Sequence, residues 1–514
     1  MIFELIIGSG LVANIFFAER FRSKARSIRK QLSPGSERHK LKRSGRTRAI
    51  TAAAFTLIFG ALWSASALAS DDDLIKEIAV LKSKLAELDQ LKERVAELEK
   101  QVSENSARIV NQQCSVDEVK KSLKGSGPAE GIIRYSPGEG VEIMPCGFKI
   151  NADATSVIQG TPNANNSGEN NASRADASWT SDIFISKAFD SWALALIHLE
   201  PGQGAGLEDQ MSLYSNVNRD AGDTSSHVLI TELWYEQYLA DAQITLTAGK
   251  LDPANYLDQN EYAFNETTQF LGRVFRNSPA IEWPGDNTLG GVITVAPEMF
   301  PYLAVNAAYH NADASWKEVF DKPFISSELN ILPAKALGYD ENMWGGNYRV
   351  YWWYNGLDHQ KLVPADESPS ETTKSTNMGY GLSFDQKVTD IFGVFARAGY
   401  ERPEVLIVST NPSAAPIEGT WSGGIQVSGK CWKRDRDILA FAVGQLFPSE
   451  RYKDAGNGGA AEGHFETYYN CKITDNLAIS PDFQWIVNPR GISEPYQGSN
   501  SPIFVYGVRA QLDF

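Results

Sequence analysis

The sequence predicts an all-β fold, a transmembrane antiparallel up-and-down β-barrel of about 16 strands, preceded by an α-helical coiled coil. Three observations predict the barrel: the alternation of the last strand, the same alternation in earlier segments, and connections that are alternately short and long. In residues 503–514, Phe504, Tyr506 and Val508 lie on the face opposite to Arg509 and Gln511. Aromatic side chains near both ends of the apolar face are typical of a strand that crosses an outer membrane.

The segments before the last strand repeat its pattern of apolar and polar side chains. The clearest of them are residues 380–387, 421–430, 463–471 and 477–486. Short connections at 388–390, 433–437 and 474–476 separate long ones at 401–420, 447–462 and 488–502. Outer-membrane barrels have this asymmetry, with short periplasmic turns and long extracellular loops. With the first strand near 141–158, ~370 residues remain for about 16 strands around a water-filled lumen.

Residues 1–69 predict a secretory signal. Three arginines precede an apolar run at 49–63, and Ala67-Leu68-Ala69 has the form of a signal-peptidase site. Cleavage is therefore expected after Ala69. A membrane anchor is the weaker alternative, because the run of about 15 residues is shorter than the roughly 20 that a spanning helix needs. The long basic part ahead of the run is explained if translation starts near Lys40 at a codon other than AUG.

Residues 70–124 predict a coiled coil, which lies in the periplasm if the barrel is correct. Apolar residues recur every seven positions, at Leu74, Leu81, Leu88, Val95, Val102 and Ile109. An isolated helix would leave this apolar seam exposed to water, so the helix is expected to self-associate in a homotrimer. Gly125, Gly127 and Pro128 break the helix, and residues 125–140 then form a linker to the barrel at 141–514.

Charge and cysteine content exclude several classes of protein. Residues 1–69 hold 12 Lys and Arg against 3 Asp and Glu, which leaves 36 against 60, a net charge of −24, for residues 70–514. This acidity argues against a nucleic-acid partner. With 6 His and no Cys-x-x-Cys pair, neither a metal site nor a cofactor is predicted. A Cys114–Cys146 disulfide stays open, whereas Cys431 and Cys471 are expected two strands, about 10 Å, apart and unpaired.

Several blocks of the sequence stand out together: residues 248–252, 257–263, 266–271, 277–281 with 283–284 and 289–291, 346–351 with 354–355, 381–386 with 395–397 and 399–400, 444–448 and 483–489. In this order they resemble the OprB family of carbohydrate-selective porins. The resemblance spans about residues 140–514, is poor over 156–226 and does not cover the coiled coil. It implies a trimeric outer-membrane channel through which small carbohydrates diffuse passively into the periplasm. The terminal Phe514 also resembles the signal by which the outer-membrane barrel assembly machinery recognises its clients.

A sugar channel needs hydrogen-bond donors and acceptors and aromatic faces at its narrowest point. Alternation places Arg349 and Arg397 on inward faces, and their guanidinium groups offer forked donors to neighbouring hydroxyls. The loop at 258–270 is expected to fold inward as the constriction loop. Lateral ion pairs within the wall are the alternative role for each inward residue. The predicted pore-lining residues are Arg349, Arg397, Tyr351, Trp353, Asp258, Asn260, Glu261, Asp482 and Arg509.

The sequence leaves two further functions open. One is a general or cation-preferring diffusion porin, because the mature chain is acidic. The other is a structural protein that ties the outer membrane to the cell wall through its coiled coil. An enzyme is not expected, since no nucleophile with a placed base and no nucleotide-binding glycine motif is recognisable.

Overall fold

The computed structural model describes a barrel and two short strands before it. The described residues are 133–136, 140–143, 147–165, 172–220, 225–285, 287–361, 374–403, 417–454, 459–491 and 501–514. The predicted signal, the coiled coil, and both Cys114 and Cys146 lie outside these ranges. Within them, no helix is long and apolar enough to span a membrane.

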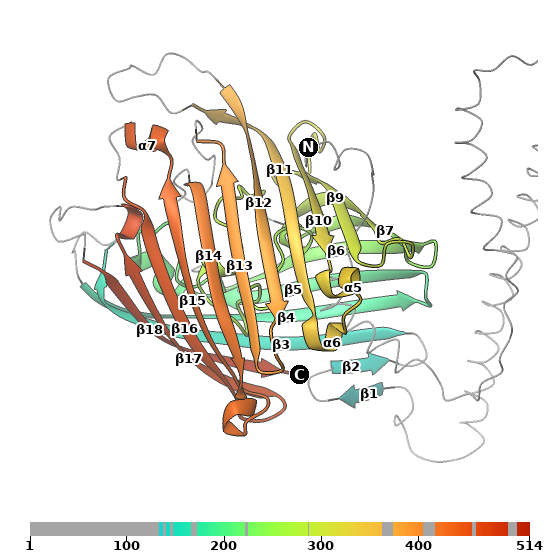
Figure 1. Cartoon of the computed structure of the whole chain (residues 1–514), viewed down its shortest axis with the longest axis horizontal. Helices are drawn as coiled ribbons and strands as arrows, with labels where there is room; N and C mark the ends of the chain where they lie inside the picture. Colours follow the sequence, from blue (N-terminus) through green and yellow to red (C-terminus); the bar gives the residue numbers. More distant parts are fainter. Residues whose placement is uncertain are drawn as a thin grey trace, which may run out of the picture. The chain divides into compact units, whose positions relative to one another are not determined.

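Sixteen antiparallel strands, β3 to β18, form the wall (Figure 1). Each strand pairs with the next, and β18 pairs with β3, so the sheet closes on itself. The predicted closed barrel and its strand number are thereby confirmed. The strands are β3 (Phe148–Ala164), β4 (Ala172–Phe189), β5 (Ala193–Gln203), β6 (His227–Leu239), β7 (Ile244–Leu251), β8 (Thr288–Val295), β9 (Leu303–Asn311), β10 (Pro323–Ile331), β11 (Gly346–Gln360), β12 (Lys374–Lys387), β13 (Phe392–Glu401), β14 (Ile417–Ser428), β15 (Ile438–Pro448), β16 (Glu462–Lys472), β17 (Leu477–Val487) and β18 (Ile503–Asp513).

The last strand has the predicted orientation. Phe504 and Tyr506 are 36% and 59% exposed on the outside of the wall, whereas Val505 and Arg509 face inward and are buried. The backbone N–H of Phe514 donates to the carbonyl of Ala152, which extends the closure to the last residue.

The first barrel strand begins later than the sequence predicted, at Phe148 rather than near Val141. The chain turns at Gly147, where φ is +67°, and the residues before it form two separate short strands, β1 (Ile133–Ser136) and β2 (Gly140–Ile143). β2 pairs with the start of β3, where β18 has already ended.

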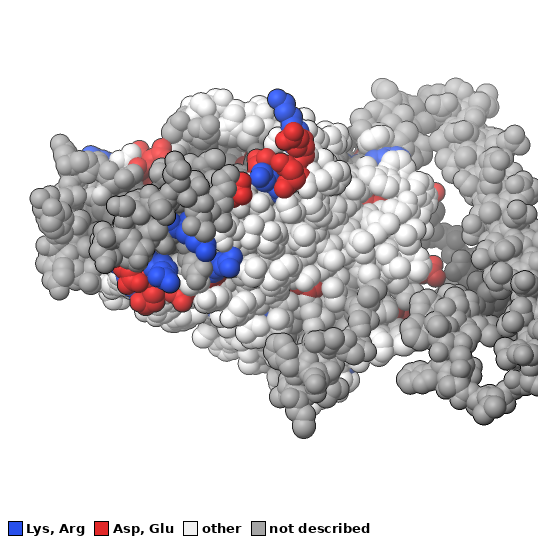
Figure 2. Space-filling model, turned by 90° about the horizontal axis from the view of Figure 1, so that it is seen from above, with Lys and Arg blue, Asp and Glu red and all other residues white. Residues whose placement is uncertain are grey.

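Most short connections lie at one end of the barrel, which we call the turn end, and most long ones lie at the other, the loop end (Figure 1). The exception at the turn end is the connection 332–345, which carries α5 and α6. This asymmetry was predicted, and the free thiols of Cys431 and Cys471 at the turn end were predicted too. The outer side seen in Figure 2 carries few charged side chains between the two ends. The short helices, all in connections, are η1 (Gly206–Gln210), η2 (Pro253–Asn255), α4 (Arg273–Arg276), α5 (Pro333–Leu337), α6 (Glu341–Trp344), η3 (Gly429–Trp432), α7 (Glu450–Asp454) and η4 (Pro489–Gly491).

Two connections from the loop end pack against the inside of the wall. The first inner loop, residues 204–220, follows β5, and its apolar side chains pack against Ile486, Ile503 and Val505. The second inner loop, residues 252–285, follows β7, and its Phe270 and Phe275 belong to an apolar cluster with wall residues of β13 to β16. The two loops contact each other, since the N–H of Arg219 donates to the carbonyl of Leu271 at 2.8 Å.

Small residues on the inner wall make room for this packing. A Cβ added to Gly381 on β12 would lie 2.3 Å from the Tyr351 hydroxyl, and one added to Gly399 on β13 would lie 2.2 Å from Oγ of Ser278 in the second inner loop. Both distances are far below van der Waals contact. Glycine at these positions therefore allows a bulky ring and a loop to lie directly on the wall.

Candidate functional site

The second inner loop is attached to the wall through Arg397 on β13. Its Nε donates to the Asp258 carboxylate at 3.0 Å, and its Nη2 donates to the carbonyls of Asp258 and Ala263 at 3.1 and 2.7 Å. Its Nη1 donates to the carbonyl of Phe275. Burial raises the pKa of the Asp258 carboxyl, although the charge of Arg397 opposes this shift. All donors that Arg397 uses are thus directed at one loop.

Two other predicted pore arginines have similar surroundings. Arg349 on β11 forms an ion pair with Asp385 at 2.5 Å and lies 3.7 Å from Glu328. Glu328 in turn accepts the backbone N–H of Asp258. Arg509 on β18 donates to two carbonyls of the second inner loop at 2.7 and 2.6 Å. The three arginines therefore hold the loop, directly or through an acidic neighbour.

The other predicted pore-lining residues are buried as well, with one exception. Trp353 and Tyr351 pack with Leu257 and Ile281 of the loop, and Asn260 donates to the carbonyl of Phe384. Glu261 alone among the nine is exposed. Their role in permeation stays a prediction. The eight buried residues are Arg349, Arg397, Tyr351, Trp353, Asp258, Asn260, Asp482 and Arg509.

Water reaches a different part of the inner wall, formed by β4, β5 and β6. There, several inward side chains are partly exposed, whereas their neighbours His198, Glu232 and Trp234 are buried. We call this region the open strip. It is rich in carboxylates and also carries aromatic side chains. Its partly exposed members are Asp176, Asp182, Phe184, Glu200, Glu236 and Tyr238.

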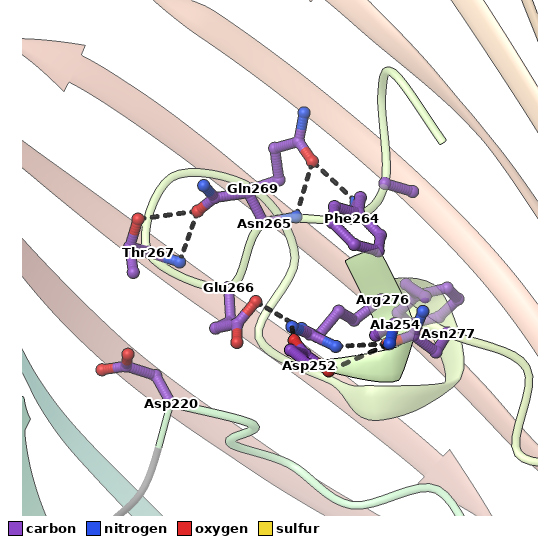
Figure 3. A network of polar contacts seen from close by, with 12 residues as sticks. Asp220, Asp252, Ala254, Phe264, Asn265, Glu266, Thr267, Gln269, Arg276 and Asn277 are labelled. Carbon is purple, nitrogen blue, oxygen red and sulfur yellow. Dashed lines mark hydrogen bonds and ion pairs between the residues drawn. The ribbon is translucent and has the colours of Figure 1, made fainter. Parts of the chain in front are cut away.

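Charged residues of both inner loops face the open strip. Figure 3 shows Arg276 of the second inner loop between Glu266 and Asp252, with Asp220 of the first inner loop near them. The Arg276 guanidinium pairs with Glu266 at 2.5 Å and lies 3.9 Å from Asp252. The charge of Glu266 also acts on Glu200 across the strip. Charged groups of the open strip and of the two inner loops are therefore close enough to interact.

Two charged side chains in this region, those of Glu200 and Arg219, have no bonding partner among the described residues. Within the described part of the chain, neither the carboxylate of Glu200 nor the guanidinium of Arg219 makes a hydrogen bond or an ion pair, although each feels the charge of the other. Glu200 is half-buried on β5, and Arg219 is exposed on the first inner loop. An acceptor and a donor set thus face the lumen together and are free to bind a solute.

A third arginine adds to the donors on the loop side. Burial lowers the pKa of Arg273 to about 10, and the neighbouring charge of Arg219 acts in the same direction. The group still carries its positive charge at neutral pH. Sequence reasoning missed Glu200, Arg219 and Arg273, because alternation shows only which side chains point inward and not which of them a loop covers.

Comparison with known proteins agrees with this architecture. The family model described as "Carbohydrate-selective porin, OprB family" matches residues 147–514. The high-pH structure of Pseudomonas putida OprB has a TM-score of 0.59 at 15% sequence identity, covering 72% of this chain and 94% of that chain. The same fold is therefore shared between the two.

Two other solved structures are similar at lower scores. The low-pH structure of Pseudomonas putida OprB has a TM-score of 0.44 at 14% identity, covering 72% of this chain and 93% of that one. The outer membrane channel DcaP of Acinetobacter baumannii has a TM-score of 0.42 at 10% identity, covering 73% and 99%. Comparison with curated proteins finds no match. From the match over the whole barrel, the chain belongs to the OprB family of carbohydrate-selective porins and is an outer-membrane channel.

Proposed function

We propose that small sugars diffuse passively through this barrel into the periplasm along the open strip. The observation that carries the proposal is the facing pair of the Glu200 carboxylate and the Arg219 guanidinium, which form no hydrogen bond or ion pair among the described residues. A carboxylate acceptor and guanidinium donors replace the water that a sugar hydroxyl loses at a constriction. The partly exposed rings of Phe184 and Tyr238 offer apolar faces to the C–H side of the sugar.

The residues predicted from the sequence have a supporting part in this proposal. Arg349, Arg397 and Arg509 hold the second inner loop, and so determine how far Glu266 and Arg276 stand from the open strip. Glu261, which is exposed, is proposed to contact the solute directly.

We also propose that the chain forms a homotrimer whose coiled coil, residues 70–124, lies in the periplasm. The regular Leu and Val seam between Leu74 and Ile109 supports self-association. Phe514 is proposed to be the signal that the barrel assembly machinery reads.

The proposed path can be tested by measuring how added sugar reduces the ion current through a single channel. Replacing Glu200→Gln or Arg219→Gln removes a charged hydrogen-bonding partner, which is typically worth about 1.5–3 kcal/mol. The sugar concentration for half-block should therefore rise about tenfold or more. The matched controls are Glu298→Gln and Lys317→Gln, which lie on exposed connections. Their sugar concentration for half-block should equal that of the parent. Unchanged half-block in both lumen variants would refute the assignment.

The acidity of the open strip favours one alternative, a cation-preferring porin. Asp176, Asp182, Glu200 and Glu236 are all partly exposed there. Reversal potentials in a salt gradient separate the two functions. A strong preference for cations that millimolar sugar does not change would favour the cation-preferring porin over the sugar channel.

A further inference from the structure

Three side chains on adjacent strands of the open strip bring metal-ligand atoms together. Asp182 lies on β4, and His198 and Glu200 lie on β5. One carboxylate oxygen of each acid and one ring nitrogen of the histidine all lie within 4.8 Å of one another. Three ligands bound tetrahedrally to one ion at 2.0–2.2 Å stand about 3.3–3.6 Å apart. Side-chain movements of about 1 Å therefore bring all three onto one ion.

The histidine is held in an orientation that suits a ligand. Its Nε2 faces Asp182 at 2.7 Å, and its Nδ1 faces Glu232 of β6 at 3.5 Å without making a hydrogen bond. His198 is only 9% exposed, and its ring stacks on Phe184 with the centroids 4.2 Å apart. Metal-ligating histidines usually present the second nitrogen to such a carboxylate, which fixes the ring and raises its basicity.

Glu232 is itself fixed by two donors. Trp234 Nε1 and Asn255 Nδ2 donate to its Oε2 at 3.0 and 3.2 Å, which leaves Oε1 directed at His198. The arrangement thus consists of three ligands and one carboxylate behind the imidazole.

An ion can reach this cluster from the lumen. Asp182 and Glu200 are partly exposed, and within the described residues the carboxylate of Glu200 makes no hydrogen bond. Three carboxylates surround one imidazole, so the local charge favours a cation. Two oxygens and one imidazole nitrogen are a donor set that zinc and neighbouring divalent transition metals accept, with a further position open to water.

We propose that Asp182, His198 and Glu200 bind a divalent transition-metal ion at the open strip, with Glu232 as a positioning residue for the imidazole. A bound ion occupies Glu200 and adds positive charge close to Arg219. It therefore blocks the path proposed for sugars. Only this block rests on the proposed function, because binding of the ion does not depend on which solute passes.

Calorimetry with Zn²⁺ alone, on the full chain in detergent, tests the site without any sugar. One ion per chain is expected for the parent. His198→Gln should abolish this binding, and Glu232→Gln should weaken it about 10- to 100-fold. His227→Gln is the matched control, because this histidine lies at the loop end of β6 and contacts the carbonyl of Ser225. Heat-dependent gel mobility confirms that each variant is folded.

Each outcome decides the matter. Absence of Zn²⁺ binding would mean that His198 serves only as an ion-pair partner of Asp182 and Glu232, and would overturn the proposal. Equal binding by the parent and His198→Gln would place the ion elsewhere and would overturn it too. A third outcome separates the two proposals. If His198→Gln loses Zn²⁺ binding but sugar does not block the ion current of the parent, the metal site is supported and the proposed sugar path is contradicted.

Discussion

The attachment of the second inner loop can be tested at Arg397. The substitution Arg397→Met removes four hydrogen bonds to the loop and leaves the Asp258 carboxylate without its charged partner. Breaking a buried ion pair from one side costs about 3–5 kcal/mol. At about 1.4 kcal/mol for each factor of ten, the equilibrium between seated and released loop shifts on the order of 100- to 4000-fold toward release.

The measurements are single-channel conductance and the size of the largest sugar that swells proteoliposomes. Both should increase in Arg397→Met, because the loop no longer narrows the lumen. Adding Asp258→Asn removes the unpaired charge, so the double variant should lie closer to the parent. Arg436→Met, at an exposed ion pair with Asp475 in a turn, is the control. Parental conductance and size limit in a normally inserted Arg397→Met channel would refute the assigned role.

Three further predictions concern stability and assembly. Gly381→Ala places a Cβ 2.3 Å from the Tyr351 hydroxyl and should lower the heat-unfolding midpoint, whereas Gly419→Ala, with no atom nearer than 3.9 Å, should not. Deleting Phe514 should reduce insertion far more than it changes conductance; normal surface levels with altered selectivity would contradict this. Burial raises the pKa of Glu208 to about 7, so the first inner loop should lose stability as pH rises from 4.5 to about 7. Hydrogen exchange of this loop, corrected for its intrinsic rate, should be faster at pH 8 than at pH 5, and Glu208→Gln should remove the difference.

The sequence predicted those features of the barrel that depend on local pattern. Each strand has a period of two, so the inward direction of Arg349, Arg397 and Arg509 follows from counting along one segment. The lengths of the connections and the aromatic residues of the last strand are local features as well. Together with the alternation, they were sufficient to predict a closed barrel. The start of the first strand was misplaced because the residues of β2 alternate as well, and β2 ends at Ile143, shortly before β3 begins at Phe148.

The candidate site depends on contacts that no local pattern contains. An inward arginine is equally polar whether it faces water or a loop, so the sequence could not distinguish Arg397 from a residue that lines the path. Arg219 lies in a region that matches the family pattern poorly, and its position follows from a backbone contact with Leu271. Likewise, Asp182 and His198 are 16 residues apart in the chain and meet only because β4 and β5 pair.

The bonds that hold the inner loops constrain the order in which the barrel folds. The N–H groups of Leu271 and Gly272 donate to Glu466 on β16, and Arg509 on β18 donates to two carbonyls of the same loop. These partners are about 190 to 240 residues later in the chain. Such distant contacts form slowly, because a long chain must be closed before they contribute. The lumen therefore acquires its final width only after the last strand has arrived, and a nascent barrel that lacks β18 is wider and leakier than the finished channel.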